Sequence, residues 1–222
     1  MIRVPPVFSI KKAHQTQKRL SEQIILEDKL PKRIRLVAGV DVAYAREISI
    51  GATVVLDYTS LRLIEKQTIA CRTRFPYVPS LLAFREIPPA VFSTRKLTVQ
   101  PDVFLVDGHG FAHPFCCGFA CHFGLMINKP TIGVAKSKLV GEIEETRKSG
   151  GVAFLKHKGE IIGAKLFTED GKKPIYVSVG HMVSLSTAVK IVMHCIKSSR
   201  IPEPILEAHK LATAEKRKAN IL

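Results

Sequence analysis

The sequence predicts an α/β protein, built from a mixed β-sheet flanked by helices. Three features indicate this fold class. Residues 36–71 hold three β-branched apolar runs joined by short turns, as in an antiparallel meander. Residues 103–106 and 131–135 are short apolar runs typical of strands that are covered on both faces. Residues 184–199 repeat apolar side chains at helical spacing.

Residues 1–35 are expected to contribute an amino-terminal helix. The clearest helical spacing covers residues 10–30, where a narrow apolar stripe stands in a polar background. The stripe consists of Leu20, Ile24 and Ile25. Pro31 is expected to end this helix, because the residue before a proline avoids helical geometry.

The meander is expected as strands at residues 36–44, 51–58 and 61–71. Asp41 lies in the middle of the first of these strands. An unpaired carboxylate would be costly there, since burial removes it from water. Asp41 is therefore either hydrogen-bonded or the ligand of a cation.

A stiff loop, Phe-Pro-Tyr-Val-Pro at residues 75–79, follows the meander. Pro76 and Pro79 restrict its backbone, so the ring of Tyr77 between them is presented by a rigid segment. The alternative is a tyrosine that packs over the edge of the core.

A helix is expected after this loop, with Ser80 as its cap. Glu86 lies among the apolar residues of the helix. Pro88 and Pro89 are expected to bend or interrupt it just after Glu86.

The stretch 101–124 carries the strongest sign of a functional site. A buried strand ends at Asp107, so a carboxylate is delivered to the edge of a sheet, where α/β enzymes often build their sites. Glycines then let backbone approach a ligand closely, at Gly108, Gly110, Gly118 and Gly124. Three imidazoles stand beside them, at His109, His113 and His122.

The remaining elements follow the same pattern of strands and helices. Strands are expected at residues 131–135, 153–157, 161–167 and 174–179, and helices at 117–128 and 184–199. Lys136 comes directly after the first of these strands. The basic tail, residues 205–222, is expected to be frayed, and the chain 1–222 is expected to form a single domain.

Composition favours a nucleic acid as the partner. The 222 residues carry 34 Lys and Arg against 19 Asp and Glu, a formal charge of +15. Five cysteines, an odd number, argue against a secreted disulfide framework. Neither a signal pattern nor an apolar run long enough to span a bilayer stands out. We therefore expect a soluble, cytoplasmic monomer that does not bind membranes.

The acidic residues point to metal-assisted chemistry. Asp41 and Asp107 on strands and Glu86 on a helix offer the oxygen ligands that Mg²⁺ prefers, and Lys136 adds a cation at a strand end. A Mg²⁺ site on a basic domain is most simply that of a nuclease. A Zn²⁺ site made of His113, Cys117, Cys121 and His122 is the alternative, although the spacing of these residues matches no standard zinc pattern.

Six segments resemble, in order, the successive motifs of the endonuclease V family. They are AGVDVAY at 38–44, PYVP at 76–79, FRE at 84–86, DVFLVDGHGFAHP at 102–114, GFACHFG at 118–124 and PTIGVAK at 130–136. The resemblance covers about residues 36–180, with VSVGH at 177–181 and RIPEP at 200–204 continuing it.

The resemblance implies a ribonuclease H-like fold and a Mg²⁺-dependent DNA-repair endonuclease, with Mn²⁺ as a substitute metal. Such an enzyme recognises hypoxanthine, the deaminated adenine of inosine, and hydrolyses the second phosphodiester bond on its 3′ side. The implied catalytic residues are Asp41, Glu86, Asp107, His113 and Lys136, the last two acting on the scissile phosphate or the attacking water. The implied metal ligands are Asp41, Asp107 and Glu86, with His209 as a further candidate.

The proline-rich loop resembles the family's wedge, whose tyrosine fills the gap left when the lesion base turns out of the stack. The substrate-binding residues that the resemblance implies are Pro76, Tyr77, Pro79, Ser80, Leu82, Gly108, Gly110 and Gly118. Phe115 stands where relatives commonly have Arg, which puts one phosphate contact in doubt. Ile205-Leu206 stands where they commonly have Thr-Arg, which makes the assignment of His209 the least secure.

Other functions remain open on the sequence alone. An inosine-specific endoribonuclease would share every motif. A ribonuclease H-like nuclease of another specificity would use the same acids without the Tyr77 wedge. A basic, non-catalytic nucleic-acid binder would be indifferent to Mg²⁺.

Overall fold

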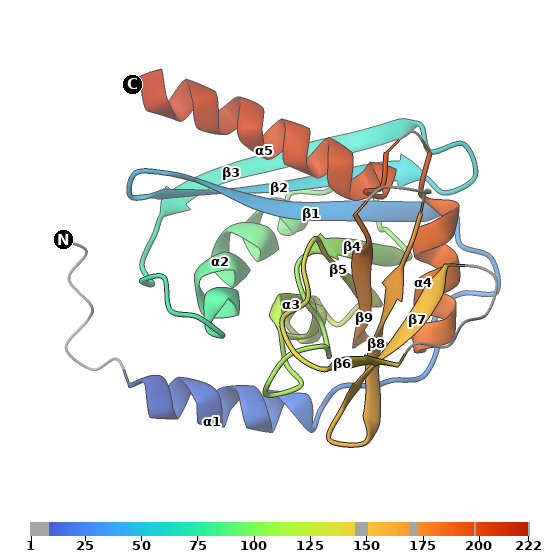
Figure 1. The fold of residues 1–222 in the computed structure, drawn as a ribbon. Coiled ribbons are helices and arrows are strands. Elements are labelled where there is room, and N and C mark those ends of the chain that lie inside the picture. The colour runs from blue at the N-terminus through green and yellow to red at the C-terminus, as the bar shows by residue number, and fades with distance from the viewer. Residues whose placement is uncertain (1–8, 145–150, 169–172, 198, 222) are drawn as a thin grey trace.

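One mixed sheet with helices on both faces forms the protein. The computed structural model describes residues 9–144, 151–168, 173–197 and 199–221. Nine strands of this part of the chain lie in the order β3-β2-β1-β4-β5-β9-β8-β7-β6 (Figure 1). The predicted α/β fold class is confirmed.

The predicted strands are present, with ends that differ by up to three residues. The strands are β1 Leu36–Ala45, β2 Ile48–Asp57, β3 Leu63–Arg72, β4 Val103–Asp107, β5 Thr131–Ala135, β6 Glu142–Glu144, β7 Val152–His157, β8 Glu160–Leu166 and β9 Ile175–His181. The helices are α1 Ile10–Ser21, α2 Leu82–Arg95, α3 Phe119–Ile127, α4 Leu185–His194 and α5 Glu203–Ile221. β6 was not predicted, because its three residues are too few to show an alternating pattern.

The pairing of the strands changes from antiparallel to parallel at the centre of the sheet. β1, β2 and β3 form the predicted antiparallel meander. β1, β4 and β5 run parallel to one another, and β9 returns antiparallel beside β5. Because the three central strands are parallel, the residues at their carboxyl ends share one edge of the sheet.

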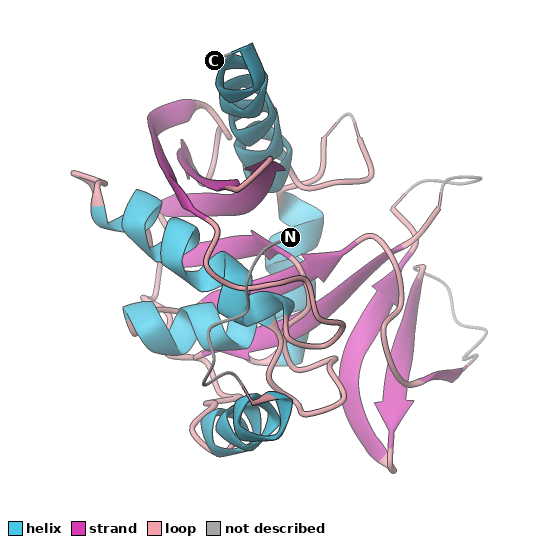
Figure 2. Ribbon diagram, turned by 90° about the vertical axis from the view of Figure 1, so that its left-hand side faces the viewer, coloured by secondary structure: helices cyan, strands magenta, loops and turns pink. Residues whose placement is uncertain are grey.

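Two hydrophobic cores lie on the two faces of this sheet. Val54 and Leu56 of β2 pack into the core covered by α4 and α5, whereas Val55 between them faces the core covered by α2 and α3. This alternation follows from the two-residue period of a strand. Figures 1 and 2 show α5 on the opposite side of the sheet from α1.

The amino-terminal helix is shorter than predicted. It ends at Ser21, and its buried residues are Ala13 and Gln17 rather than the expected stripe. Beyond the helix, the chain is held at the start of α4: the carboxylate of Asp28 accepts hydrogen bonds from the backbone N–H of Ser184 and the hydroxyl of Thr187. The segment before Pro31 is therefore not helical and lies against the start of α4. Residues 1–8 lie outside the described chain.

The expectation of a frayed tail is wrong for residues 205–221, which belong to helix α5; Leu222 lies outside the described chain. Ile205, Ala208 and Ala212 of α5 are buried. Gly39 of β1 permits the close approach, since a Cβ there would lie 1.8 Å from the carbonyl oxygen of Pro204. This buried face is small and apolar, and the basic residues at the end of the helix do not reveal it in the sequence.

The start of α2 also differs from the prediction. Leu81, not Ser80, is the residue at its N-cap position, and no side chain caps it. Ser80 has a φ of +65°, a left-handed conformation that is strained for a serine. Pro88 and Pro89 lie inside a helix that continues through them to Arg95.

Candidate active site

The parallel strands bring the predicted acids together. Val40 of β1 pairs with Val106 of β4, so the next residues, Asp41 and Asp107, lie side by side. Asp107 pairs in turn with Val134 of β5, which places Lys136 just beyond the end of that neighbouring strand. Three charged residues far apart in sequence therefore meet at one edge of the sheet.

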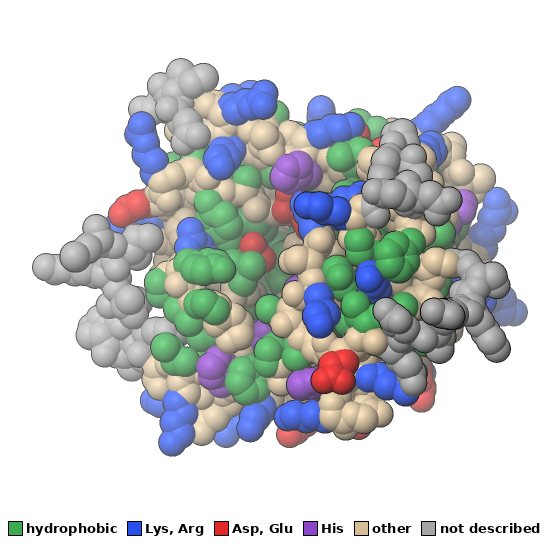
Figure 3. All heavy atoms as spheres, viewed as in Figure 1, with side chains coloured by type: hydrophobic (Ala, Val, Ile, Leu, Met, Phe, Trp, Pro, Cys, Tyr) green, Lys and Arg blue, Asp and Glu red, His purple; other side chains and the backbone are tan. Residues whose placement is uncertain are grey.

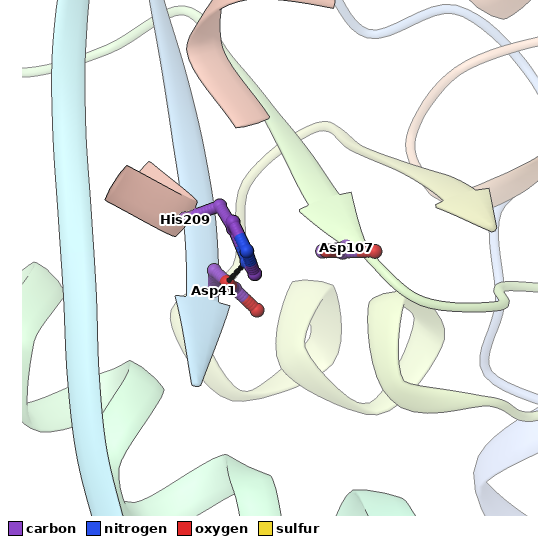
Figure 4. A group of neighbouring side chains, drawn as sticks. All are labelled: Asp41, Asp107 and His209. Atoms are coloured by element: carbon purple, nitrogen blue, oxygen red, sulfur yellow. Dashed lines mark hydrogen bonds and ion pairs between the residues drawn. The ribbon is translucent and has the colours of Figure 1, made fainter. Parts of the chain in front are cut away.

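Asp41, Asp107 and His209 form a group that is able to hold a metal ion. Each offers one ligand atom, and these atoms all lie within 4.8 Å of one another. Figure 4 shows the two carboxylates on neighbouring strands, with His209 reaching in from α5. His209 stands one helical turn after the buried Ile205, so the packing of α5 on the sheet positions it.

Hydrogen bonds orient each member of the group. The Nδ1–H of His209 donates to Oδ2 of Asp41 at 2.8 Å, and the backbone N–H of Val42 donates to Oδ1 at 2.8 Å. Lys136 Nζ donates to Oδ2 of Asp107 at 2.6 Å. The lysine side chain is 43% exposed, so its charge faces the solvent side of the site as well as Asp107.

Burial and mutual repulsion disfavour the charged carboxylates. Burial, and next the charge of Asp107, raise the pKa of Asp41 above its ordinary value. Burial, and next the charge of Asp41, raise the pKa of Glu86 well above its ordinary value. The hydroxyl of Tyr44 donates to Oε1 of Glu86 at 3.3 Å and acts in the opposite direction. A cation would relieve this repulsion.

A cavity of about 310 Å³ opens beside the acidic group, and we call it the edge cavity. Glu86 and Gly108 connect the two, since both line the cavity and Gly108 follows Asp107 directly. Glu86 is not one of the three clustered ligands; it stands in the wall of the cavity next to them.

Six of the eight predicted substrate-binding residues line the edge cavity: Tyr77, Pro79, Ser80, Leu82, Gly108 and Gly118. Pro76 and Gly110 are not among its lining residues. Gly110 is required for packing, because a Cβ there would lie 2.1 Å from the carbonyl oxygen of Val179 in β9. His109, one of the three imidazoles noted in the sequence, also lines it. Six further lining residues were not predicted: Val78, Ala83, Phe119, Ser137, Lys138 and Leu139.

His113 lines the edge cavity rather than joining the acidic group. Its Nε2–H donates to the carbonyl oxygen of Ser80 at 3.1 Å, and its Nδ1 accepts from the backbone N–H of Phe115 at 3.2 Å. Burial lowers the pKa of His113 to about 4. The imidazole is therefore neutral at pH 7, and both of its nitrogens are engaged.

Helix α1 braces the cavity, a role that its sequence did not reveal. The fully buried Gln17 donates from Nε2 to the carbonyl oxygens of Ser80, at 2.8 Å, and Cys117, at 3.2 Å. His14 stacks on Phe115 with ring centroids 4.4 Å apart. The sequence could not predict this role of Gln17, because it is one polar residue among many in α1 and only the fold shows which face of the helix is covered.

The alternative zinc site does not form in the described part of the chain. The group of His, Cys and acidic side chains found there is the one around Asp41. Cys121 is fully buried and donates from Sγ to the carbonyl oxygen of Val179 at 3.4 Å. His122 packs edge-on against Phe84, with ring centroids 5.3 Å apart. These residues fill the core around α3.

The surface around the site is mostly basic and apolar. Figure 3 shows acidic side chains near the centre of one face, with Lys and Arg spread around them. Tyr77 is 69% exposed, so its ring is presented at the surface. This agrees with the prediction of a ring held out by a rigid loop and not with a tyrosine packed over the edge of the core. Among the described helices, none is long and apolar enough to cross a membrane.

Comparison with known proteins identifies the family. Residues 18–210 match the family described as Endonuclease V. An Endonuclease V of Thermofilum pendens is 45% identical over 96% of this chain and 91% of its own length. The Endonuclease V structure from Streptomyces avermitilis superposes with a TM-score of 0.88 at 35% identity, covering 99% of both chains.

A structure with bound nucleic acid is also similar. The Ciona intestinalis Endonuclease V (D234N), in complex with a 23mer DNA containing an inosine followed by a ribo-adenosine, superposes with a TM-score of 0.83 at 34% identity. The match covers 95% of this chain and 98% of that one. The sequence and structural matches span the strands that build the acidic edge and the loops that line the edge cavity, and the chain therefore belongs to the endonuclease V family of nucleases.

Proposed function

We propose that the protein is a Mg²⁺-dependent endonuclease that recognises hypoxanthine in inosine-containing DNA. It hydrolyses the second phosphodiester bond on the 3′ side of the lesion, in DNA repair, as a cytoplasmic monomer. The observation that carries the proposal is the edge cavity opening directly beside the acidic group. A base held in the cavity leaves its strand close to the carboxylates.

The donor set fits a hard divalent cation. Asp41 and Asp107 are the proposed ligands, with Glu86 beside them, and oxygen donors of this kind suit Mg²⁺. Carboxylate oxygens also suit Mn²⁺, in keeping with the substitute metal. His209 either binds the ion or orients Asp41 through their hydrogen bond. A bound ion of this kind would lower the pKa of a water and neutralise charge on the scissile phosphate.

The chain's own residues supply the rest of the site. Lys136 is anchored on Asp107 and half-exposed, which suits contact with a phosphate oxygen on the solvent side. Glu86 is held by Tyr44 at the boundary between the cavity and the acids. His113 fixes the carbonyl of Ser80 and thereby the cavity wall, a supporting role that fits its two engaged nitrogens better than proton transfer.

The edge cavity suits a base that has left its helix. Enzymes that act on one base turn it out of the stack and hold it in a pocket, at a cost of a few kcal/mol. Gly108 and Gly118 let backbone form part of the cavity wall, and Tyr77 stands exposed at its mouth. Stacking of that ring in the vacated space offsets part of the cost.

Moving the lesion tests this proposal. A set of labelled DNA strands differs only in the position of one inosine, and each is paired with the same complement. The cut should move with the inosine and stay at the second bond on its 3′ side. A cut that stays in place when the inosine moves would contradict the proposal and favour a nuclease of another specificity. The same set made of RNA tests the endoribonuclease alternative.

A further inference from the structure

A second cavity, of about 290 Å³, lies on another face of α2; we call it the arginine cavity. Its lining includes Arg72, Arg74, Arg85, Phe75, Phe84 and Phe92. The α2 residues that line it fall on a different side of the helix from Leu82, Ala83 and Glu86, which line the edge cavity. The loop of residues 73–80 contributes to both cavities. Arg74 and Phe75 line the arginine cavity, and residues 77–80 line the edge cavity.

The arginine cavity is cationic. Three arginines line it, and no acidic side chain of the described residues does. Arg72 has an ion pair at its edge, with Glu47 at 3.4 Å, and both side chains are largely exposed. The guanidinium of Arg85 lies 4.1 Å from the ring centroid of Tyr44, and its buried Nε has no hydrogen-bond partner among the described residues. Guanidinium groups gathered in a lining without a carboxylate favour an anionic ligand, and phosphate most of all.

The same cavity also presents aromatic faces. Phe75 and Phe84 are stacked, with ring centroids 5.6 Å apart, and Phe92 is 46% exposed. An exposed ring beside guanidinium groups is the combination that binds nucleotides, since the base stacks while its phosphate is held by arginine. An acidic peptide would use the arginines but not the exposed ring.

We propose that the arginine cavity binds a nucleotide of the strand opposite the inosine, an inference that rests on the proposed function. The exposed Tyr77 belongs to the loop that runs between the two cavities. A ring inserted at the lesion separates the two strands. Since the inosine enters the edge cavity on one side of this loop, the partner strand is left on the side of Arg72 and Arg74. The phosphate of its nucleotide meets those arginines, and its base meets Phe92.

Binding measurements on three substrates test this inference. They are an inosine duplex, the same inosine strand alone, and an inosine duplex that lacks the base opposite the lesion. Phe92→Ala should weaken binding to the complete duplex about tenfold, as expected for the loss of one stacked base. The loss should be several times smaller for the single strand and for the duplex without the opposite base. Arg74→Ala should weaken binding to both duplexes, because the phosphate remains, and should affect the single strand least.

Matched controls separate the site from general effects. Phe154→Ala removes another exposed phenylalanine, on β7, and Arg95→Ala removes another exposed arginine of α2 that lies outside the cavity. Phe92→Leu keeps apolar bulk without the ring and should bind like Phe92→Ala. Melting temperatures of all variants show whether each is folded.

Two results would overturn the inference. Equal losses for duplex and single strand would assign the cavity to the inosine strand itself, and variants that behave like the two controls would show that it binds no nucleotide. A wild-type protein that binds inosine and adenine duplexes equally would instead overturn the proposed function. The two failures are therefore distinguishable.

Discussion

At the level of single residues, Asp41 and Asp107, the proposed metal ligands, lie close enough for their charges to repel one another. Asp41→Asn and Asp107→Asn should each lower the rate of cleavage in Mg²⁺ by about a hundredfold or more, since loss of a ligand exceeds the cost of losing an outer partner. Binding to inosine DNA should persist or tighten, because each change removes a negative charge near phosphate. Single-turnover cleavage and fluorescence anisotropy measure the two effects.

Asp57→Asn is the matched control for these substitutions. Asp57 accepts hydrogen bonds from Ser60 in a turn, and an asparagine oxygen still accepts them. This variant should cleave like the wild type. Normal cleavage by Asp107→Asn would remove that residue from the metal site.

Two buried histidines make stability depend on pH. Burial lowers the pKa of both His113 and His122 from 6.5 to about 4. Between these values the unfolded chain binds more protons than the folded protein. The free energy of unfolding is therefore unaffected by these histidines well above pH 6.5, and it decreases as the pH falls toward 4. The loss from pH 6.5 to pH 5 is roughly 2 kcal/mol per histidine.

His122→Phe removes one of these titrations. The ring continues to fill the space against Phe84, and the buried Nδ1, which has no partner in the described chain, is lost with the imidazole. The free energy of unfolding from urea titrations should therefore fall less steeply between pH 6.5 and pH 5 than in the wild type. An unchanged slope would show that His122 does not titrate in this range.

At the scale of elements, α1 acts as a brace for the edge cavity. Gln17→Met keeps the length of the side chain but cannot donate to the carbonyls of Ser80 and Cys117, which are left with fewer partners. The change should cost about 1–3 kcal/mol of stability and weaken binding to inosine DNA by loosening the cavity wall. Urea unfolding and anisotropy with inosine and adenine strands test this.

Gln15 offers a matched control on the same helix, because it is exposed. Gln15→Met should leave both stability and binding close to the wild type. If the two variants behave alike, α1 does not brace the cavity, and the two hydrogen bonds of Gln17 have no effect on binding.

The sequence predicted the elements that have a clear period and missed those defined by contact. The central strands were predicted well, because apolar runs that end at Asp107 and before Lys136 carry a local signal. The helical tail was missed because its buried side chains are mostly small, and its fit depends on Gly39 of a distant strand. The prediction of Ser80 as a helix cap is wrong for a similar reason, since the strained conformation of Ser80 is held by contacts with the distant His113 and Gln17.

The residues of the site likewise fall into those that the sequence predicts and those that only the fold places. The sequence predicted Asp41 and Asp107 as metal ligands, but their adjacency follows from the parallel pairing of β1 with β4, which was not predicted. His209 could not be placed without α5. The glycines correctly predicted that residues 101–124 contribute to the cavity, but not what each glycine does. Gly118 lines the edge cavity, whereas Gly110 packs against β9. Residues of β3, the loop 73–80 and α2 line the arginine cavity, and their spacing along the chain forms no pattern that would predict it.

At the scale of the whole molecule, the excess of 15 positive charges favours any polyanion. Binding to undamaged DNA should therefore weaken steeply with salt, with a slope of log K against log salt of about −0.9 for each phosphate neutralised. Inosine DNA should show a similar slope at higher affinity, because the base contacts add little charge. A nearly flat plot would contradict a nucleic-acid substrate.

In the proposed function, a cavity for hypoxanthine and a metal-binding edge act as one site. The most direct measurement is the single-turnover cleavage of one labelled duplex carrying inosine or adenine at the same position, with Mg²⁺ or with chelator. We expect rapid cleavage for inosine with Mg²⁺ and little or none for the other three combinations. Equal cleavage of the inosine and adenine strands, or cleavage that persists in chelator, would contradict it.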